Sequence, residues 1–386
     1  MAKRIILAVA GSGKTYYICH SIDLNKKNLI LAFTHENLRN IRRELCDANK
    51  GKLPELTNVM TFDSFLYSYM LQPYEPTILD FFNASDISTY GLTFREPPAK
   101  QLLINNMWRA NPLYKSKDKI GHYLTSKGYY YCENLSELIL QVKQGKNSLI
   151  KRIAENASIF YDQILVDEFQ DFREHDYDLI CELAKYAKNI TLIGDYYQHS
   201  VSANKNTGRP FQKRKVDVPY KDFIESLKNI FIVDDSSMQN SRRCSENICN
   251  FVSNKLQIRI ASQKINNGSV IWVTENQIDE ILQNSTIVKL IYKDSSKYLF
   301  TAINWSYSKG DTFDAACVIL TDKFDNLDSD SFNPSKIEQS TINKLYVALT
   351  RSKGNLFLIK KLVFDKVKIK YLKDAHHAQN KNHRNP

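Results

Sequence analysis

The segment RIILAVAGSGKT, residues 4–15, decides the fold of this chain. Its apolar start is typical of a buried β-strand, and its end opens a stretch with a helical pattern. Between them, Gly11 and Gly13 let the backbone curl so that its N–H groups point at phosphate oxygens, and the helix N-terminus adds a favourable dipole. We therefore predict a phosphate loop in which Lys14 contacts the β- and γ-phosphates of a nucleotide and the Thr15 hydroxyl binds Mg²⁺. The loop residues expected to bind the nucleotide are Ala10, Gly11, Ser12, Gly13, Lys14 and Thr15.

A second segment, ILVDEFQD at residues 164–171, carries the acidic groups that such a site needs. A parallel sheet would place Asp167 at the carboxyl edge of its strand, where ligands bind in α/β folds. A carboxylate there suits the Mg²⁺ shell, and Glu168 suits a general base that acts on the attacking water. The alternative, an acid-rich helix N-terminus, explains two adjacent carboxylates but not their register with the phosphate loop. The two segments together indicate a phosphate-loop NTPase.

Short β-branched runs alternate with helical stretches in both halves of the chain. The runs are almost continuously apolar, as in parallel strands that are buried on both faces, and their alternation with helices predicts a doubly wound α/β fold. In the first half, strands are expected at Arg4–Ala8, Asn28–Phe33, Asn58–Phe62, Gln163–Val166 and Asn189–Ile193, and helices at Tyr16–Leu24 and Glu36–Ala48. In the second half, strands are expected at Ser269–Val273, Thr286–Tyr292, Tyr298–Asn304, Ala316–Thr321 and Asn355–Ile359.

Residues 71–155 interrupt this alternation. They contain five prolines, many aromatic residues and helical patterns at Ala99–Trp108 and Leu135–Gln144. We predict that they form a mostly helical insertion, an accessory subdomain of the first domain. The predicted division is a first α/β domain at 1–70 and 156–235, the insertion at 71–155, a second α/β domain at 236–373, and a disordered basic tail at 374–386.

Composition limits the class of protein. Hydrophobic residues make up 43% and charged residues 25% of the chain, as in an ordinary globular protein, and no apolar run approaches the roughly 20 residues of a membrane helix. Seven scattered cysteines without a CxxC pair favour reduced thiols in a cytoplasmic protein and argue against a structural zinc. Cys244 and Cys249 are expected to be small buried residues. The net charge of +11 raises the odds of a polyanionic partner.

Eight segments, in the family's order, resemble the motifs of superfamily 1 helicases of the UvrD and Rep type. They cover most of the chain outside residues 71–155. The segments are AVAGSGKT (8–15), FTH (33–35), TFDSF (61–65), VDEFQD (166–171), GDYYQ (194–198), SRRCS (241–245), SKGDTFD (308–314) and YVALTRSK (346–353). The resemblance implies two RecA-like motor domains, ATP with Mg²⁺ as cofactors, and single-stranded or duplex DNA as the partner.

The resemblance also carries roles to individual residues. It makes Gln198 the sensor of the γ-phosphate and makes Arg243 and Arg351 arginine fingers, whose permanent charge suits the γ-phosphoryl group as negative charge develops there. Further nucleotide contacts are expected at Arg242, Gly310 and Thr312. DNA contacts are expected at Thr34, His35, Thr61, Phe62, Ser64 and Ser306. Trp305, an aromatic residue close to the SKGDTFD segment, is a further candidate for stacking on a base, although such a residue is more often part of the core.

The chain also departs from the family pattern. Ala8 replaces the first glycine of the phosphate loop, and only seven residues precede it, so the adenine-reading glutamine motif of the family is not expected. Arg242 stands where the family stacks a tyrosine on adenine, so adenine selectivity should be weak. The Trp and Arg that usually follow GDxxQ are absent. About 65 residues separate Arg243 from Lys309, which leaves no room for the second accessory subdomain of Rep-like enzymes.

Three functions remain open at this point. The first is a nucleic-acid-stimulated ATPase that translocates on single-stranded DNA and unwinds duplexes weakly. The second is a DNA-sensing regulatory ATPase that activates a partner nuclease, such as an OLD-family nuclease in a Gabija-like bacterial defence cluster. The third is a motor directed to RNA. The chain itself shows no nuclease signature, and no membrane partner is expected.

Overall fold

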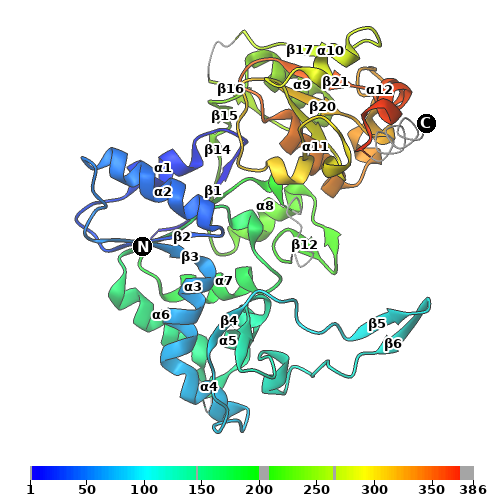
Figure 1. Cartoon of the computed structure of the whole chain (residues 1–386). Helices are drawn as coiled ribbons and strands as arrows, with labels where there is room; N and C mark the ends of the chain where they lie inside the picture. Colours follow the sequence, from blue (N-terminus) through cyan, green and yellow to red (C-terminus); the bar gives the residue numbers. More distant parts are fainter. Residues whose placement is uncertain (1, 145–146, 200–207, 264–266, 374–386) are drawn as a thin grey trace. The chain divides into compact units, whose positions relative to one another are not determined.

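The computed structural model describes residues 2–144, 147–199, 208–263 and 267–373, which exclude the tail predicted at 374–386 (Figure 1). The chain divides into two compact units. Unit 1 comprises Met1–Ile5, Thr15–Ile193 and Asn206–Val233, and unit 2 comprises Ile6–Lys14, Gly194–Lys205 and Asp234–Pro386. In this division the phosphate loop and the GDYYQ segment group with the second half of the chain. The predicted domain boundaries stay predictions.

The larger sheet has six strands and the order β14-β1-β11-β10-β2-β3. Its strand β2, next to the edge strand β3, is buried along its whole length and pairs in parallel with β10 on one side and β3 on the other. This is why its sequence, NLILA, is apolar almost without interruption. The strands agree with the predicted ones to within a residue or two where both exist. They are β1 (Lys3–Ala8), β2 (Asn28–Ala32), β3 (Thr57–Thr61), β10 (Gln163–Val166), β11 (Ile190–Gly194) and β14 (Ile232–Met238).

Two helices in the first half of the chain, α2 and α3, begin at a threonine that caps them. The hydroxyl of Thr34 accepts a hydrogen bond from the Asn37 N–H and so starts α2, which buries Leu38, Ile41 and Leu45 on one face. The helices are α1 (Lys14–Ser21), α2 (His35–Ala48), α3 (Phe62–Phe65), α4 (Glu75–Phe81), α5 (Leu135–Gln141), α6 (Leu149–Phe160), α7 (Asp176–Tyr186) and α8 (Tyr220–Lys228).

The insertion differs from its prediction, because it mixes short strands with helices. The helix expected at Ala99–Trp108 is wrong: β5 and β6 pair antiparallel there as a hairpin that reaches away from the rest of the insertion (Figure 1). Asn105 and Asn106 both adopt positive φ, at 51° and 60°, which is the geometry of a tight hairpin turn. The Asn-Asn turn signal therefore outweighed the helical spacing of the apolar residues. The strands are β4 (Gly91–Thr93), β5 (Gln101–Ile104), β6 (Met107–Ala110), β7 (Tyr129–Tyr131), β8 (Lys143–Gln144) and β9 (Asn147–Ser148).

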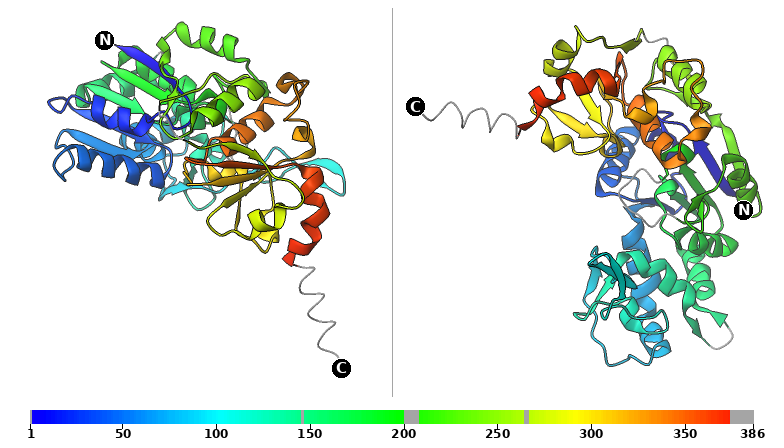
Figure 2. Two further views of the ribbon diagram at one scale, coloured as in Figure 1. Left: turned by 90° about the horizontal axis from the view of Figure 1, so that it is seen from above. Right: turned by 90° about the vertical axis from the view of Figure 1, so that its right-hand side faces the viewer.

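Unit 2 contains a five-stranded parallel sheet of order β17-β21-β20-β18-β19. Along β20, Ala316 and Val318 face one apolar core together with α9 and α11, whereas Cys317 and Ile319 face a second core with α10 and α12. This alternation with period two places helices on both faces of the sheet (Figure 2). The elements are α9 (Glu246–Leu256), β17 (Val270–Trp272), α10 (Ile278–Gln283), β18 (Val288–Ile291), β19 (Ala302–Asn304), β20 (Ala316–Ile319), α11 (Gln339–Leu349), β21 (Leu356–Ile359) and α12 (Lys361–Val367).

The two sheets confirm the predicted α/β class with parallel sheets. Each of the five strands predicted in the second half exists, although β19 is shorter than the run Tyr298–Asn304. Cys244 and Cys249 are buried free thiols in the core of unit 2, as expected. Over the described residues, no helix is both long enough and apolar enough to cross a membrane.

Candidate active site

The phosphate loop follows β1 and packs against residues 241–243 of unit 2. Gly11 and Gly13 have φ of +73° and +90°, a conformation that other residues adopt only with strain. The Gly11 carbonyl accepts a hydrogen bond of 2.8 Å from the Arg242 N–H. A Cβ atom added to Gly11 would lie 2.7 Å from the Arg243 Cβ and 2.8 Å from the Ser241 Oγ. Glycine at position 11 is therefore required by both its φ and its neighbours.

The loop fits a nucleotide polyphosphate. The Ser12 Oγ is buried and has no hydrogen-bond partner among the described residues, as expected for a hydroxyl that donates to a ligand oxygen when the ligand is bound. Lys14 and Thr15 open the first turn of α1, where the positive end of the helix dipole favours a phosphate. The described residues contain no cluster of three or more His, Cys, Asp or Glu side chains that could hold a metal. Mg²⁺ in phosphate-transfer sites needs only one or two protein oxygens besides phosphate and water, and Thr15 and Asp167 supply that kind of donor.

Tyr346 joins the phosphate loop to the GDYYQ segment. Its buried hydroxyl accepts a hydrogen bond of 2.8 Å from the Ala10 N–H and donates one of 3.2 Å to the Asp195 Oδ2. The same carboxylate accepts hydrogen bonds from the Gln198 side chain, at 2.7 Å, and from the Tyr197 N–H. Burial and the charge of Asp195 raise the pKa of Tyr346 well above its ordinary value, so the hydroxyl stays protonated. The predicted γ-phosphate sensor Gln198 is thus linked to the loop that would hold the phosphates. The Ala10 N–H already donates to the Tyr346 hydroxyl, so in this conformation it does not point a hydrogen bond at a phosphate.

The three predicted arginines occupy different environments in unit 2. Arg242 is exposed, with its Nε bonded to Gln263 and its guanidinium packed over Gly13. Arg243 is half-buried and donates to the Thr350 carbonyl at 3.1 Å. Arg351 is almost completely buried. Arg242 and Arg243 lie beside the phosphate loop. Their roles in nucleotide binding stay predictions.

Arg351 uses its guanidinium to hold backbone. Its Nε donates to the Val347 carbonyl at 2.8 Å, and its Nη1 reaches the carbonyls of Ser308 and Asp311 at 3.4 Å. Burial lowers the pKa of Arg351, and the nearby charge of Arg243 lowers it further. The side chain therefore ties the YVALTRSK helix to the SKGDTFD segment in this conformation, and its predicted role as an arginine finger is untested.

In unit 1 the acidic pair follows β10. Asp167 is buried, and its N–H donates to the Leu31 carbonyl at 2.9 Å, which continues the pairing of β10 with β2. Glu168 has φ 53° and ψ 41°, a left-handed conformation that costs a non-glycine residue energy and is often found at functional sites. The Gln170 amide donates a hydrogen bond to the Glu168 carboxylate and so orients it.

The FTH and TFDSF segments, which are predicted to contact DNA, follow the neighbouring strands β2 and β3, respectively. Ala32 of β2 pairs with Thr61 of β3, so the chain enters the FTH and TFDSF segments side by side. Thr34, His35 and Ser64 are exposed there, and the Thr61 hydroxyl caps α3 by accepting from the Ser64 N–H. This edge of the sheet therefore presents small polar side chains to solvent.

Two of the predicted DNA contacts are core residues instead. Phe62 is buried and stacks on Phe33 at a ring distance of 5.2 Å. Trp305 is fully buried in the second unit, with its Nε1 bonded to the Leu290 carbonyl. Neither ring can stack on a base in this conformation. Near Trp305, Ser306 is half-buried, whereas Gly310 and Thr312 are exposed.

Comparison with known proteins identifies the family. A profile of the AAA domain family matches residues 2–204, more than half of the chain. The chain belongs to the AAA domain family. As an AAA domain protein with this phosphate loop, it is an ATP hydrolase. A probable DNA helicase II homolog of Mycoplasma genitalium is 24% identical over 66% of the chain and 40% of its own length. The chain thus spans less than half of that relative.

Solved structures similar to this AAA domain protein include the helicase nonstructural protein 10 of an arterivirus. It is 12% identical, with 92% of the chain and 59% of the viral protein covered, at a TM-score of 0.43. The complex of that helicase with DNA matches with the same identity and TM-score, over 92% of this chain and 60% of the viral protein. The name of the bacterial relative agrees with the UvrD and Rep resemblance of the motifs.

Sequence reasoning missed a buried charge network in this AAA domain protein. Arg173, two residues after the DEFQD segment, forms ion pairs with Asp63 of the TFDSF segment and with Asp176. Although burial opposes its charge, the carboxylates of Asp176 and Asp63 raise the pKa of Arg173. Asp176 also accepts a hydrogen bond from Ser136 of the insertion. The TFDSF segment and α7 therefore meet at one guanidinium, and the insertion joins them through the hydrogen bond from Ser136 to Asp176. In the sequence, only the position of Arg173 just after the DEFQD segment could have suggested this.

A second part of the network contains two histidines. Glu137 of the insertion bonds His122 at 3.3 Å, His175 at 3.1 Å and Lys117. Burial alone would raise the pKa of Glu137, but the hydrogen bonds from its three partners together hold it well below its usual value. The hydrogen bond to Glu137 is the largest cause of the raised pKa of each histidine. The carboxylate therefore stabilises the fold above about pH 4.5, and the histidines do so most fully below about pH 6.5.

Proposed function

We propose that this chain is an ATP-driven motor of the UvrD and Rep type that translocates along single-stranded DNA. One observation carries the proposal. The strands β10, β2 and β3 are adjacent and parallel, and their carboxyl ends lead into the acidic pair, the FTH segment and the TFDSF segment, respectively. The groups expected to act on ATP and the groups expected to touch DNA thus leave one edge of one sheet, where ligands bind in α/β folds.

The chemistry assigned to unit 1 is the activation of water. Glu168 would act as the general base, and its left-handed backbone and the hydrogen bond from Gln170 hold its carboxylate in one orientation. Asp167, buried at the end of β10, would hold Mg²⁺ together with Thr15. The ion, when bound, supplies positive charge beside the β- and γ-phosphates.

The chemistry assigned to unit 2 is the binding and sensing of the phosphates. Gln198, tied through Asp195 and Tyr346 to the loop, would report the state of the γ-phosphate to that unit. Arg243, whose backbone packs against Gly11, would approach the γ-phosphoryl group as an arginine finger. We propose that closure of the two units on ATP completes the site and that their reopening moves the chain along the strand.

Unwinding of duplex DNA is the weaker part of the proposed activity. The insertion is the segment that would meet the duplex junction. Its charge is mixed, and some of its basic side chains offer contacts to phosphates. These are Arg95, Lys100, Arg109, Lys115, Lys117 and Lys119. Because only about 65 residues separate Arg243 from Lys309, too few for a second accessory subdomain, we expect single strands to stimulate hydrolysis clearly and the isolated protein to unwind weakly. A partner nuclease, a defence cluster, an RNA substrate and a cytoplasmic location stay predictions from the sequence.

The test measures ATP hydrolysis with no nucleic acid, with single-stranded DNA, with duplex DNA and with RNA. Stimulation by single-stranded DNA supports the proposal, and equal rates in all four conditions contradict it. Glu168→Gln should retain ATP and DNA binding and lower turnover at least about a hundredfold. Glu182→Gln removes a surface carboxylate that pairs with Lys185 and serves as the matched control. Near-normal hydrolysis by Glu168→Gln would refute its assignment as the base.

A further inference from the structure

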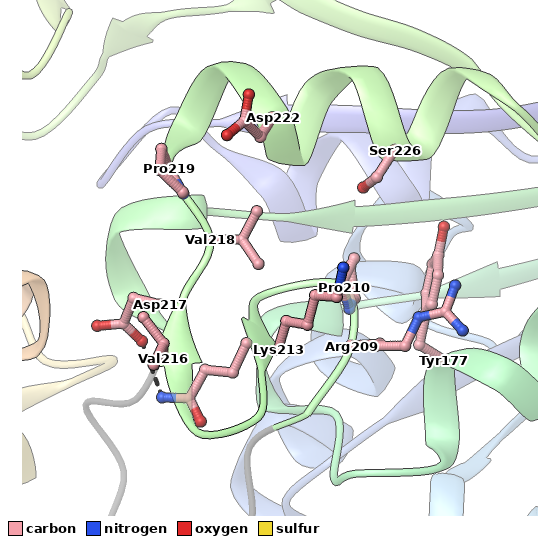
Figure 3. Close-up of a pocket in the computed structure, with 11 residues that line it drawn as sticks. Tyr177, Arg209, Pro210, Lys213, Val216, Asp217, Val218, Pro219, Asp222 and Ser226 are labelled. Carbon is pink, nitrogen blue, oxygen red and sulfur yellow. Dashed lines mark hydrogen bonds between the residues drawn. The ribbon is translucent and has the colours of Figure 1, made fainter.

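A cavity of about 710 Å³ lies in unit 1 between α7, α8 and the hairpin of β12 (Gln212–Lys213) and β13 (Val216–Asp217) (Figure 3). Its apolar walls come from Pro210, Val216, Val218 and Pro219. Its polar lining includes side chains that can donate and accept hydrogen bonds. These are Arg209, Gln212, Lys213, Asp217, Asp222 and Ser226. Apolar walls with a few convergent polar groups are the usual form of a ligand site.

The cavity contains a buried hydroxyl that lacks a partner. Tyr177 of α7 lines the cavity and is only 3% exposed, and its hydroxyl makes no hydrogen bond with any described residue. In Figure 3 its ring stands beside Arg209 and its hydroxyl points toward α8. Burial, together with the nearby Cys181 thiol, raises the pKa of Tyr177, so the hydroxyl stays a donor. The sulfur of Cys181 is at best a weak acceptor for this donor, and a ligand oxygen or nitrogen in the cavity would be a stronger partner.

The tip of the same hairpin is a strained basic turn. Arg214 and Lys215 have φ of 54° and 65°, in the left-handed region where hairpin turns normally use Asn and Gly. These two residues and Lys213 are exposed, and none of the three has an ion pair among the described residues. Two long basic side chains are the wrong choice for this turn on conformational grounds alone. Strain of this kind persists where the side chains serve a function.

Charge identifies the class of ligand. Residues 208–219 contain four basic side chains and one acidic side chain. Arg209 pairs with Asp178 at 3.2 Å, which leaves the three cations of the turn for a polyanion. Phosphates spaced along a nucleic-acid strand suit a row of cations at the tip, while a base suits apolar walls with a hydrogen-bond donor beside them.

From this arrangement we infer a second nucleic-acid contact in unit 1: the turn at 213–215 binds phosphates of single-stranded DNA, and the cavity beside it takes one unstacked base. This inference rests on the proposed function and extends it. It also supplies a strand contact shortly after the GDYYQ segment, where the Trp and Arg of related motifs are missing from the sequence.

The phosphate contact is tested by the double substitution R214N/K215G. Asn-Gly is the preferred sequence for this turn, so the substitution removes two charges while it favours the hairpin. Affinity for an oligothymidylate should fall about tenfold, and the slope of log affinity against log salt should become shallower by about 1.4, that is, about 0.7 for each lost contact. K185A/K188A removes two exposed cations that are already paired with Glu182 and Asp162 and should change neither quantity. Wild-type affinity and slope in R214N/K215G would overturn the inference.

The base contact is tested separately. Tyr177→Phe should lose about three- to tenfold in affinity with an unchanged salt slope, because one neutral hydrogen bond is lost. Tyr186→Phe, on the same helix but outside the cavity lining, is the control. An oligonucleotide of abasic sites should bind wild type and Tyr177→Phe equally, and equal binding of the normal oligonucleotide by both proteins would refute the base pocket.

The outcomes also separate this site from the proposed function and from another ligand. If wild type shows no stimulation by any nucleic acid, the proposed function fails. If stimulation is present but R214N/K215G binds normally, only this site fails. If R214N/K215G loses affinity for polyglutamate but not for DNA, the turn binds an acidic protein segment and the inference is wrong.

Discussion

Removal of one hydroxyl, in Tyr346→Phe, should weaken unit 2 strongly. The hydroxyl is fully buried, and it links the Ala10 N–H at 2.8 Å to the Asp195 carboxylate at 3.2 Å. Phenylalanine fills the same ring volume, so the change removes two hydrogen bonds and creates no large cavity.

The magnitude follows from what is left behind. The buried Ala10 N–H would lose its acceptor, which costs about 1–3 kcal/mol. Asp195 would keep the hydrogen bonds from Gln198 and from the Tyr197 N–H, so its loss is smaller. We therefore expect the free energy of unfolding to fall by about 2–3 kcal/mol. With a urea slope of about 2 kcal/mol per molar, the unfolding midpoint should fall by about 1 M.

The assay should report on unit 2 alone. The chain has three tryptophans, of which Trp108 lies in the insertion and is 67% exposed, while Trp272 and Trp305 lie in unit 2. Urea unfolding followed by tryptophan fluorescence in a Trp108→Phe background therefore measures that unit. Tyr298→Phe is the matched control, because Tyr298 is buried in the same unit and its hydroxyl makes no hydrogen bond with the residues that the structure describes. Equal midpoints for Tyr346→Phe and Tyr298→Phe would show that the link does not stabilise the loop.

Three further predictions concern the charge network and the nucleotide. Arg173→Ala leaves two carboxylates without their buried partner and should lower the free energy of unfolding of unit 1 by about 3–5 kcal/mol in urea titrations, so a loss below 1 kcal/mol would contradict the network. Glu137→Gln should destabilise the protein most between about pH 4.5 and 6.5. The difference in thermal unfolding temperature between this variant and wild type should shrink as the pH rises through the raised pKa values of His122 and His175. A difference that grows toward pH 9 would contradict this assignment. Because the motif resemblance places Arg242 where the family stacks a tyrosine on adenine, hydrolysis of ATP should exceed that of GTP less than about tenfold in kcat/KM. A hundredfold preference would show that other residues read the base.

Much of the fold and part of the site could be predicted from the sequence, because the deciding signals are local. A buried parallel strand must be apolar on both faces, and NLILA at β2 shows this directly in its letters. The glycines at 11 and 13 are local as well, since positive φ is a property of one residue. The same holds for Thr34 and Thr61, whose hydroxyls cap the helices that follow them.

Predictions that depended on the surroundings of a side chain were less secure. Phe62 lies in the TFDSF motif and Trp305 close to the SKGDTFD motif, and both were candidates for DNA contacts, yet both are packed in cores. The run Ala99–Trp108 has apolar residues at helical spacing, but two asparagines with positive φ turn it into a hairpin. Burial and turn geometry depend on what else packs nearby, which one segment does not contain.

By itself, then, the sequence determined the alternation of strands and helices, the phosphate loop and the acidic pair, because each is set by the chemistry of residues that are neighbours in the chain. Only the tertiary structure decided that Tyr346 joins Ala10 to Asp195. Each of these two residues lies more than 150 positions from Tyr346 in the sequence. It also decided that Arg173 reaches Asp63, 110 residues away. Such contacts arise when strands far apart in the chain become neighbours in a sheet, so the distances that control hydrogen bonds and pKa values exist only once the fold has formed.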